Sequence, residues 1–311
     1  PQLRFEGFTD DWEERKLSDV ANHRGGTAIE KYFDKDGVYK VISIGSYGLN
    51  SQYVDQNIRA ISNEITDGRV VNSGELTMVL NDKTANGTII GRTLLVEKDN
   101  EYVINQRTEI ISPKENFDSN FAYTILNGPF REKVKRIVQG GTQIYVNYPA
   151  VSNLNLELPK IEEQQKIGSF FKQLDDTIAL HQRKLDLLKE QKKGYLQKMF
   201  PKNGAKVPEL RFAGFADDWE DCKLEEVLRE RNNQQSQSLE NPLVSFTVEK
   251  GVTPKTDRYE REQLVVGDKS SKKYKVTVLN DIVYNPANLK FGAISRNKYG
   301  NAVFSPIYIT F

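Results

Sequence analysis

The stretch from Pro159 to Pro201 has a seven-residue hydrophobic repeat. Apolar residues recur there in two rows offset by four positions, and these rows contain Ile167, Phe171, Leu174, Ile178, Leu185, Leu188 and Met199. Two such rows form the seam of a coiled-coil helix. We therefore predict one helix from about Glu162 to Phe200, which would be about 58 Å long at 1.5 Å per residue. A helix of this length is typical of a spacer that packs its seam on a partner.

The residues before this helix alternate between short apolar runs and turn residues. Strands are predicted where aliphatic residues cluster between Gly, Asn and Asp, at Val38–Ile44, Leu76–Leu80, Thr88–Ile90, Thr93–Glu97 and Glu109–Ile111. The pattern of Phe117–Val138 predicts two helices broken at Gly128-Pro129. A polar loop, Gln139–Asn147, and a last strand-like run, Val151–Leu158, lead into the long helix. The pattern predicts an α+β fold with mixed α/β domains.

The chain also contains a long internal repeat. The twenty residues Pro1–Val20 recur at Pro208–Val227, and thirteen of the twenty positions are identical. The residues that follow correspond in part, since Asp281–Asn285 resembles Glu75–Val79. A period of about 200 residues is too long for a solenoid and indicates a duplicated module. The two helices, the glycine loop and the long helix have no second copy, so we expect the second module to be incomplete in this sequence.

Composition narrows the class of protein. The chain has 311 residues, of which 38% are hydrophobic and 28% are charged, and its formal net charge is +1. This length favours two domains over one. No run of 18 apolar residues is present, so we expect no membrane span. Cys222 is the only cysteine, which rules out a disulfide within the chain and favours a reducing, cytoplasmic location.

The common catalytic and cofactor-binding motifs are missing from the sequence. It contains no GxxxxGK[ST] phosphate loop, no GxGxxG turn, and no HExxH or CxxC metal pattern. Its two histidines, His23 and His181, offer little for a Ser-His-Asp arrangement. Asn285-Pro286-Ala287-Asn288 lacks the second proline and the aromatic residue of the DNA amino-methyltransferase motif, and we interpret it as a turn. We therefore expect a binding or scaffolding role, with no catalytic residue and no metal site.

Several segments resemble one protein family. Pro159-Lys-Ile-Glu-Glu-Gln-Gln-Lys-Ile167 resembles the Pro-x-x-x-Glu-Gln-x-x-Ile signature of the specificity (S) subunits of Type I restriction-modification systems. Leu174–Ile178, Lys189–Phe200, the Gly140-Gly141-Thr142 loop and the repeated Pro-x-Leu-Arg-Phe-x-Gly-Phe opening resemble the same family. The domains implied are an opening segment, a first target recognition domain, a central spacer helix, a second opening segment and a truncated second recognition domain, at residues 1–20, 21–160, 161–207, 208–227 and 228–311.

The resemblance implies a complex in which DNA recognition and catalysis belong to different subunits. Each target recognition domain would read one half of a bipartite site in double-stranded DNA, and the long helices would pair antiparallel and hold the domains apart. Methyltransferase (M) subunits would dock on these helices and methylate adenine N6, and restriction (R) subunits would join to cut DNA. S-adenosylmethionine, ATP and Mg²⁺ would then belong to the partner subunits, and this chain would carry no cofactor of its own.

Candidate DNA contacts follow from the chemistry of base recognition. Direct readout needs side chains such as Arg, Lys, Asn and Gln, usually on loops between strands. In the first domain we predict contacts by Asn81, Lys83, Thr84, Arg92, Gln139, Thr142, Gln143 and Tyr145. In the second domain we predict contacts by Lys272, Lys273 and Lys290. We expect Arg131–Arg136 to form a solvated helix face, and Asn105-Gln106-Arg107 to brace the fold.

Two other classes of function stay open from the sequence. A coiled-coil scaffold that binds only protein partners would also lack catalytic residues, and sequence-specific DNA binding by a complex containing the chain would exclude it. An enzyme that acts by itself is the second class, and it would require turnover without added partners.

Overall fold

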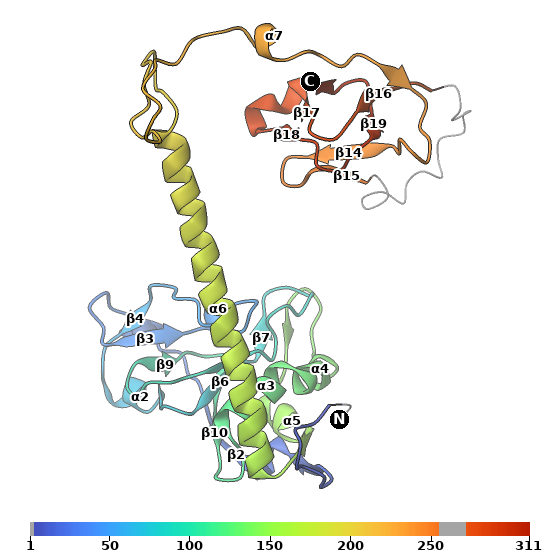
Figure 1. The fold of residues 1–311 in the computed structure, drawn as a ribbon. Coiled ribbons are helices and arrows are strands. Elements are labelled where there is room, and N and C mark those ends of the chain that lie inside the picture. The colour runs from blue at the N-terminus through green and yellow to red at the C-terminus, as the bar shows by residue number, and fades with distance from the viewer. Residues whose placement is uncertain (1–2, 255–271) are drawn as a thin grey trace. The chain divides into compact units, whose positions relative to one another are not determined.

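The computed structural model describes residues 3–254 and 272–311. The chain divides into two compact units, Pro1–Lys192 and Lys193–Phe311. Helix α6 (Ile161–Lys198) is one continuous element that crosses this boundary (Figure 1). The predicted combination of helices and strands with one long helix is confirmed.

The first unit is built on two four-stranded sheets. The antiparallel sheet has the order β2-β10-β6-β8, with strands β2 (Ala21–Gly25), β10 (Thr108–Pro113), β6 (Leu76–Val79) and β8 (Thr93–Leu95). The mixed sheet has the order β4-β3-β9-β5, with β3 and β9 parallel, and its strands are β4 (Arg59–Ala60), β3 (Tyr39–Ile42), β9 (Tyr102–Ile104) and β5 (Val70–Val71). Short helical turns lie between strands, namely η1 (Glu30–Tyr32), η2 (Ile44–Ser46) and α2 (Glu64–Asp67). A three-residue turn joins β9 to β10 and so links the two sheets.

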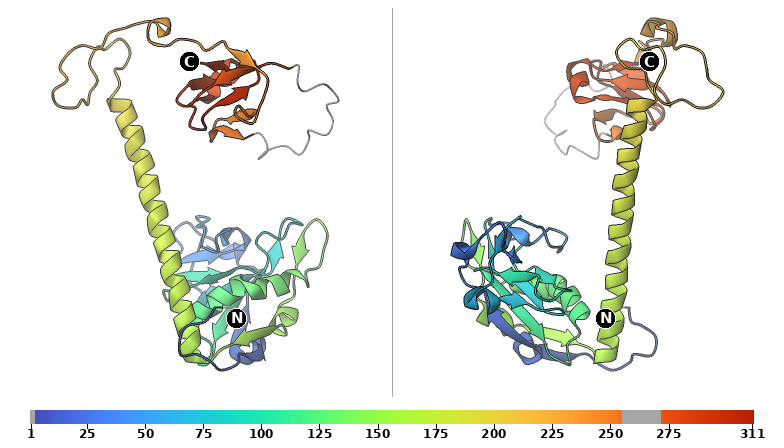
Figure 2. Two further views of the ribbon diagram at one scale, coloured as in Figure 1. Left: turned by 45° about the vertical axis from the view of Figure 1, so that its right-hand side comes forward. Right: turned by 90° about the vertical axis from the view of Figure 1, so that its left-hand side faces the viewer.

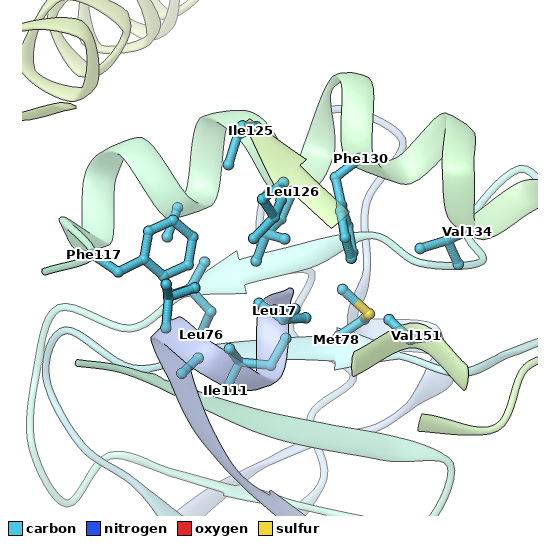
Figure 3. Packing of buried hydrophobic residues seen from close by; sticks show 14 of the residues in the cluster. Leu17, Leu76, Met78, Ile111, Phe117, Ile125, Leu126, Phe130, Val134 and Val151 are labelled. Carbon is cyan, nitrogen blue, oxygen red and sulfur yellow. The ribbon is translucent and has the colours of Figure 1, made fainter. Parts of the chain in front are cut away.

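Strand β6 is buried on both faces, which explains why it is apolar except at Thr77. Leu76 and Met78 belong to the core cluster beneath the helices (Figure 3). Val79 belongs to the cluster on the opposite face. Thr77 also faces that side, where its Oγ1 accepts a hydrogen bond from the Tyr47 hydroxyl at 2.9 Å. Because side chains alternate along β6, this one strand contributes to the hydrophobic clusters on both of its faces.

Helices α3 (Ser119–Asn127) and α4 (Pro129–Lys135) cover the antiparallel sheet. Helix α3 begins after Asp118, whose carboxylate accepts a hydrogen bond from the Phe121 N–H at 2.8 Å. Pro129 occupies the first turn of α4, where a missing N–H costs nothing. Leu126 and Phe130 project from the two helices into the core (Figure 3). The predicted pair of helices with a break at Gly128-Pro129 is confirmed.

The first turns of α6 dock on the first unit through the residues of the Pro-x-x-x-Glu-Gln pattern. Glu163 is buried and forms an ion pair with Arg4 at 2.7 Å. Gln164 accepts a hydrogen bond from the Asp118 N–H at 3.1 Å and donates to two backbone carbonyls. The views in Figure 2 show α6 leaving this docked end as a straight helix. The sequence pattern thus fixes where the helix starts and how it is held.

The last residues of the opening repeat are buried in its first copy and exposed in its second. In the first copy, β1 (Glu13–Lys16) pairs with β12 (Asn155–Leu158), and α1 (Leu17–Val20) buries both of its apolar residues. In the second copy, α7 (Leu224–Val227) leaves Leu224 and Val227 67% and 63% exposed. In the first copy these apolar residues belong to the main core cluster of the first unit.

The described part of the second unit contains short strands in small antiparallel groups. They are β13 (Gln234–Gln235), β14 (Val244–Thr247), β15 (Gly251–Pro254), β16 (Tyr274–Thr277), β17 (Ile282–Tyr284), β18 (Ile294–Arg296), β19 (Ala302–Phe304) and β20 (Ile309–Thr310). The order β18-β17-β20 matches the order β8-β6-β10 of the first unit. The antiparallel pair β16·β19 likewise matches β5·β9, and a parallel bridge from Leu243 to Val303 matches the parallel pair β3·β9.

Two predicted strands were wrong in part. Thr88–Ile90 forms turns instead of a strand, because its carbonyls bond to the side chain of Arg131 and not to a neighbouring strand. Val151–Leu158 begins with the end of a helical turn, α5 (Tyr148–Ser152), and only Asn155–Leu158 is extended. Both runs contain buried apolar residues, such as Ile90 and Val151, and buried apolar residues alone do not distinguish a strand from a turn.

Candidate nucleic-acid interface

The polar loop predicted at Gln139–Asn147 contains a tight hairpin. The backbones of Gln139 and Tyr145 bond to each other in both directions at 2.9 Å. Gly140 has a φ of +101°, and a Cβ at this position would lie 2.2 Å from the Gln143 carbonyl oxygen. Only glycine fits such a turn. The hairpin therefore presents Thr142 and Gln143 at an exposed tip.

A second predicted segment pairs with this hairpin. Strand β7 (Asn81–Asp82) runs antiparallel to β11 (Ile144–Tyr145), with Asn81 opposite Tyr145. Ile144 is buried in the core and anchors the hairpin, whereas Tyr145 is 37% exposed. Two groups of predicted contact residues, about 60 positions apart in the sequence, thus share one surface.

Asp82 fixes the loop that follows β7. Its buried carboxylate accepts hydrogen bonds from the backbone N–H and the hydroxyl of Thr84 and from the Ile89 N–H, each at 2.9 Å. Burial acts to raise the pKa of Asp82, but the hydrogen bonds from Ile89 and Thr84 outweigh burial and hold that pKa below its usual value. Thr84 is therefore engaged in shaping the loop, while Lys83 is exposed beside it.

Two arginines brace the far end of the same loop. Arg92 donates to the Thr88 carbonyl at 2.9 Å and to the Ser51 hydroxyl at 2.8 Å. Arg131 donates to the carbonyls of Gly87, Thr88 and Ile90 at 2.8–2.9 Å. Burial lowers the pKa of both guanidinium groups. The expectation that Arg131 belongs to a solvated helix face was wrong, because the loop carbonyls need a buried donor.

An open cleft of about 680 Å³ lies beside the hairpin, and its lining includes Asn81, Arg107, Glu109, Tyr145, Asn147 and Tyr148. The turn Asn105-Gln106-Arg107 borders it. Asn105 and Gln106 brace the fold as predicted, since both side-chain amides donate to Glu30 at 3.0 and 2.9 Å. Arg107 was predicted to do the same and does not, because its side chain is exposed at the cleft. A sequence signal for Arg107 as a DNA contact was available, because it is a basic residue in a turn between two strands. Lys83 was predicted on the same criterion.

The candidates in the second unit combine basic and aromatic groups. The ammonium of Lys272 lies 5.8 Å from the centre of the Tyr274 ring, and that of Lys290 lies 4.9 Å from the Phe291 ring. Lys290 belongs to η5 (Pro286–Phe291), so the turn predicted at Asn285–Asn288 is a short 3-10 helix. Lys272 and Lys273 are exposed and follow residues 255–271, which lie outside the described part of the chain.

Most of the predicted seam on α6 is exposed. Phe171, Leu174, Ile178, Leu185 and Leu188 are between 41% and 65% exposed. Met199 is half-buried. Ile167 differs, because it packs against the core of the first unit where α6 docks. The exposed apolar stripe therefore begins after the docked end of the helix.

Within residues 3–254 and 272–311, no helix has the length and apolar content needed to cross a bilayer. No group of three or more His, Cys, Asp or Glu side chains there is arranged to hold a metal ion.

Comparison with known proteins identifies the family. The model of the type I restriction modification DNA specificity domain matches residues 9–190, more than half of the chain. The chain belongs to this family. The matched residues of this specificity-domain family include the hairpin, β7 and most of α6, so the candidate surface in the first unit lies within the shared domain.

Individual relatives agree with this assignment. The specificity subunit of type I restriction enzyme MjaVIII from Methanocaldococcus jannaschii is 26% identical over 192 residues, which are 59% of this chain and 44% of that protein. The HindI specificity subunit from Haemophilus influenzae is 27% identical over 177 residues, 55% of this chain and 37% of that protein. The matched parts span less than half of the length of these two relatives.

A solved structure shares the fold. The crystal structure of a Type-I restriction-modification system S subunit from M. genitalium has a TM-score of 0.57 and 13% sequence identity, and the comparison covers 100% of this chain and 74% of that chain. At this level of identity the likeness concerns the arrangement of the backbone.

Proposed function

We propose that the chain is the DNA-recognition subunit of a type I restriction-modification complex and reads a bipartite site in double-stranded DNA. The first unit would read one half of the site and the second unit the other. The specificity-domain family supports recognition of DNA sequence. The matching sheet orders of the two units support a duplicated recognition module.

One observation carries the proposal for the first unit, namely the pairing of β7 with β11. This pairing gathers Asn81, Gln143 and Tyr145 on one surface. Asn and Gln side chains can each present a donor and an acceptor to a base edge, and an exposed tyrosine adds apolar contact and a hydroxyl. Asp82 and Gly140 hold the two loops in place, so the readout groups are positioned before DNA binds.

The exposed seam of α6 supports the second part of the proposal. An apolar stripe between Phe171 and Leu188 needs a covering surface. We propose that it pairs antiparallel with a second long helix and that the pair holds the two recognition units at a fixed separation. Methyltransferase subunits would dock on this pair with S-adenosylmethionine, and restriction subunits would add an ATP- and Mg²⁺-dependent nuclease. This chain would contribute recognition and no catalytic residue.

The test is methylation of DNA by reconstituted complexes. The chain with a cognate methyltransferase subunit is expected to methylate adenine at a two-part site, and neither protein alone is expected to do so. Sequencing of the methylated bases gives the recognised motif. Adenine methylation by this chain alone would contradict the proposal, and so would a cognate complex that methylates without sequence preference. The latter result would favour a scaffold that binds only protein.

A further inference from the structure

Three backbone segments meet at the cleft beside the hairpin. The Leu80 N–H donates to the Arg107 carbonyl at 2.9 Å, and the Val146 N–H donates to the Leu80 carbonyl at 2.9 Å. Residues 107, 80 and 146 therefore lie side by side across the floor of the cleft. The next residues along two of these segments, Asn81 and Asn147, line the cleft together with Arg107.

The backbone of Arg107 has an unusual conformation. Its φ is +69°, in the left-handed region that favours glycine. The turn is held in this shape by Asn105, whose side-chain oxygen accepts hydrogen bonds from the N–H groups of Ile29 and Gln106. The hydroxyl of Thr108 also donates to the Asn105 carbonyl at 2.5 Å. A long cationic side chain at a position suited to glycine indicates a functional role for that side chain.

The guanidinium of Arg107 is available for a ligand. Within the described residues it makes no hydrogen bond or ion pair, unlike Arg24, which pairs with Glu75, or Arg131, which is bonded to loop carbonyls. Glu109 also lines the cleft, but its carboxylate is buried and lies 2.6 Å from His23 Nδ1. The cleft thus contains an exposed cationic fork and a carboxylate that already has a partner.

We propose that Arg107 reads a base edge in the half-site bound by the first unit, with guanine as its preferred partner. The planar guanidinium donates two parallel hydrogen bonds, and guanine presents two acceptors, O6 and N7, side by side in the major groove. Because the turn is held by hydrogen bonds, backbone motion does not reorient the Arg107 side chain. This assignment rests on the proposed function, since it names a residue that would set the DNA specificity of the same surface.

The test compares variants in the complex with a cognate methyltransferase subunit. The substrate is a library of DNA duplexes with both half-sites randomised, and the readout is the methylated motif. Arg107→Ala is expected to lower discrimination at one base pair of one half-site by roughly tenfold to a hundredfold. Arg107→Lys keeps the positive charge but not the planar fork, so discrimination at that base pair should still fall. Lys98→Ala removes an exposed charge in the segment that precedes β9 and should leave the motif unchanged.

Arg107→Gly separates recognition from folding. Glycine suits the left-handed turn, so its thermal midpoint should equal or exceed that of the parent chain while discrimination is lost. Unchanged base preference in Arg107→Ala and Arg107→Gly would overturn the assignment. A uniform loss of affinity with a smaller salt dependence would also overturn it, because that result identifies a phosphate contact. If the parent complex selects no site, the proposed function itself fails.

Discussion

At the scale of single residues, buried polar groups build the candidate interface. Asp82 begins one loop, Arg131 of α4 contacts its far end, and each bonds to several backbone groups of that loop. The sequence indicated the exposed members of this surface, such as Lys83 and Gln143, from residue type and loop position. The sequence did not indicate that Asp82 and Arg131 are buried and hold the loop. Within a polar stretch, no sequence pattern distinguishes a buried charged side chain from a solvated one.

Asp82→Ala is predicted to destabilise the first unit by about 1–3 kcal/mol, because two backbone N–H groups lose a buried acceptor. Asp34→Ala is the matched control, since Asp34 is exposed and accepts one N–H in an open turn; its effect should be below about 0.5 kcal/mol. Denaturant unfolding measures both changes. Equal effects of the two substitutions would show that the carboxylate does not hold the loop.

The same carboxylate predicts a pH dependence. Because the pKa of Asp82 is lowered in the folded chain, its contribution to stability is present above the ordinary aspartate pKa and is lost as the pH falls through the lowered value. The loss should therefore occur below about pH 4. Parent chain and Asp82→Ala should differ in stability at neutral pH and converge in strongly acidic solution. A difference that persists there would contradict this account.

At the scale of elements, the sequence predicted helices better than short strands. The long helix and the break at Gly128-Pro129 followed from heptad spacing and from a residue that cannot continue a helix. Strand β9 was missed, because three residues give too few alternations to be recognised. The pairing of β7 with β11 could not be predicted either, since two-residue strands find each other through the surrounding core and not through their own pattern.

The two glycines of α6 should respond oppositely to substitution. A Cβ on Gly168 would lie 2.6 Å from the Phe121 nitrogen, so Gly168→Ala should push α6 away from α3 and destabilise the first unit by about 1–3 kcal/mol. A Cβ on Gly194 meets nothing within 4 Å, so Gly194→Ala should stabilise the helix by up to about 1 kcal/mol. Thermal unfolding of the two variants measures the contrast. Stabilisation by both would mean that α6 is not docked through Gly168.

At the scale of the whole chain, each unit has its own core and sheets and contains one copy of the opening repeat. The sequence predicts a duplicated module from the repeat and its period, a prediction that the similar strand orders of the two units support. It could not predict which exposed residues contact a base, because that depends on loops whose shapes are set by tertiary bonds. If each unit reads its own half-site, the segment between the opening repeat and α6 should determine one half of the motif.

The central claim is tested most directly by exchanging residues 21–160 for the corresponding segment of another member of the specificity-domain family. The methylated motif is then sequenced before and after the exchange, with the same methyltransferase subunit. We predict that one half of the two-part motif changes while the other half is retained. A motif that changes in both halves, or in neither, would contradict independent reading by the two units.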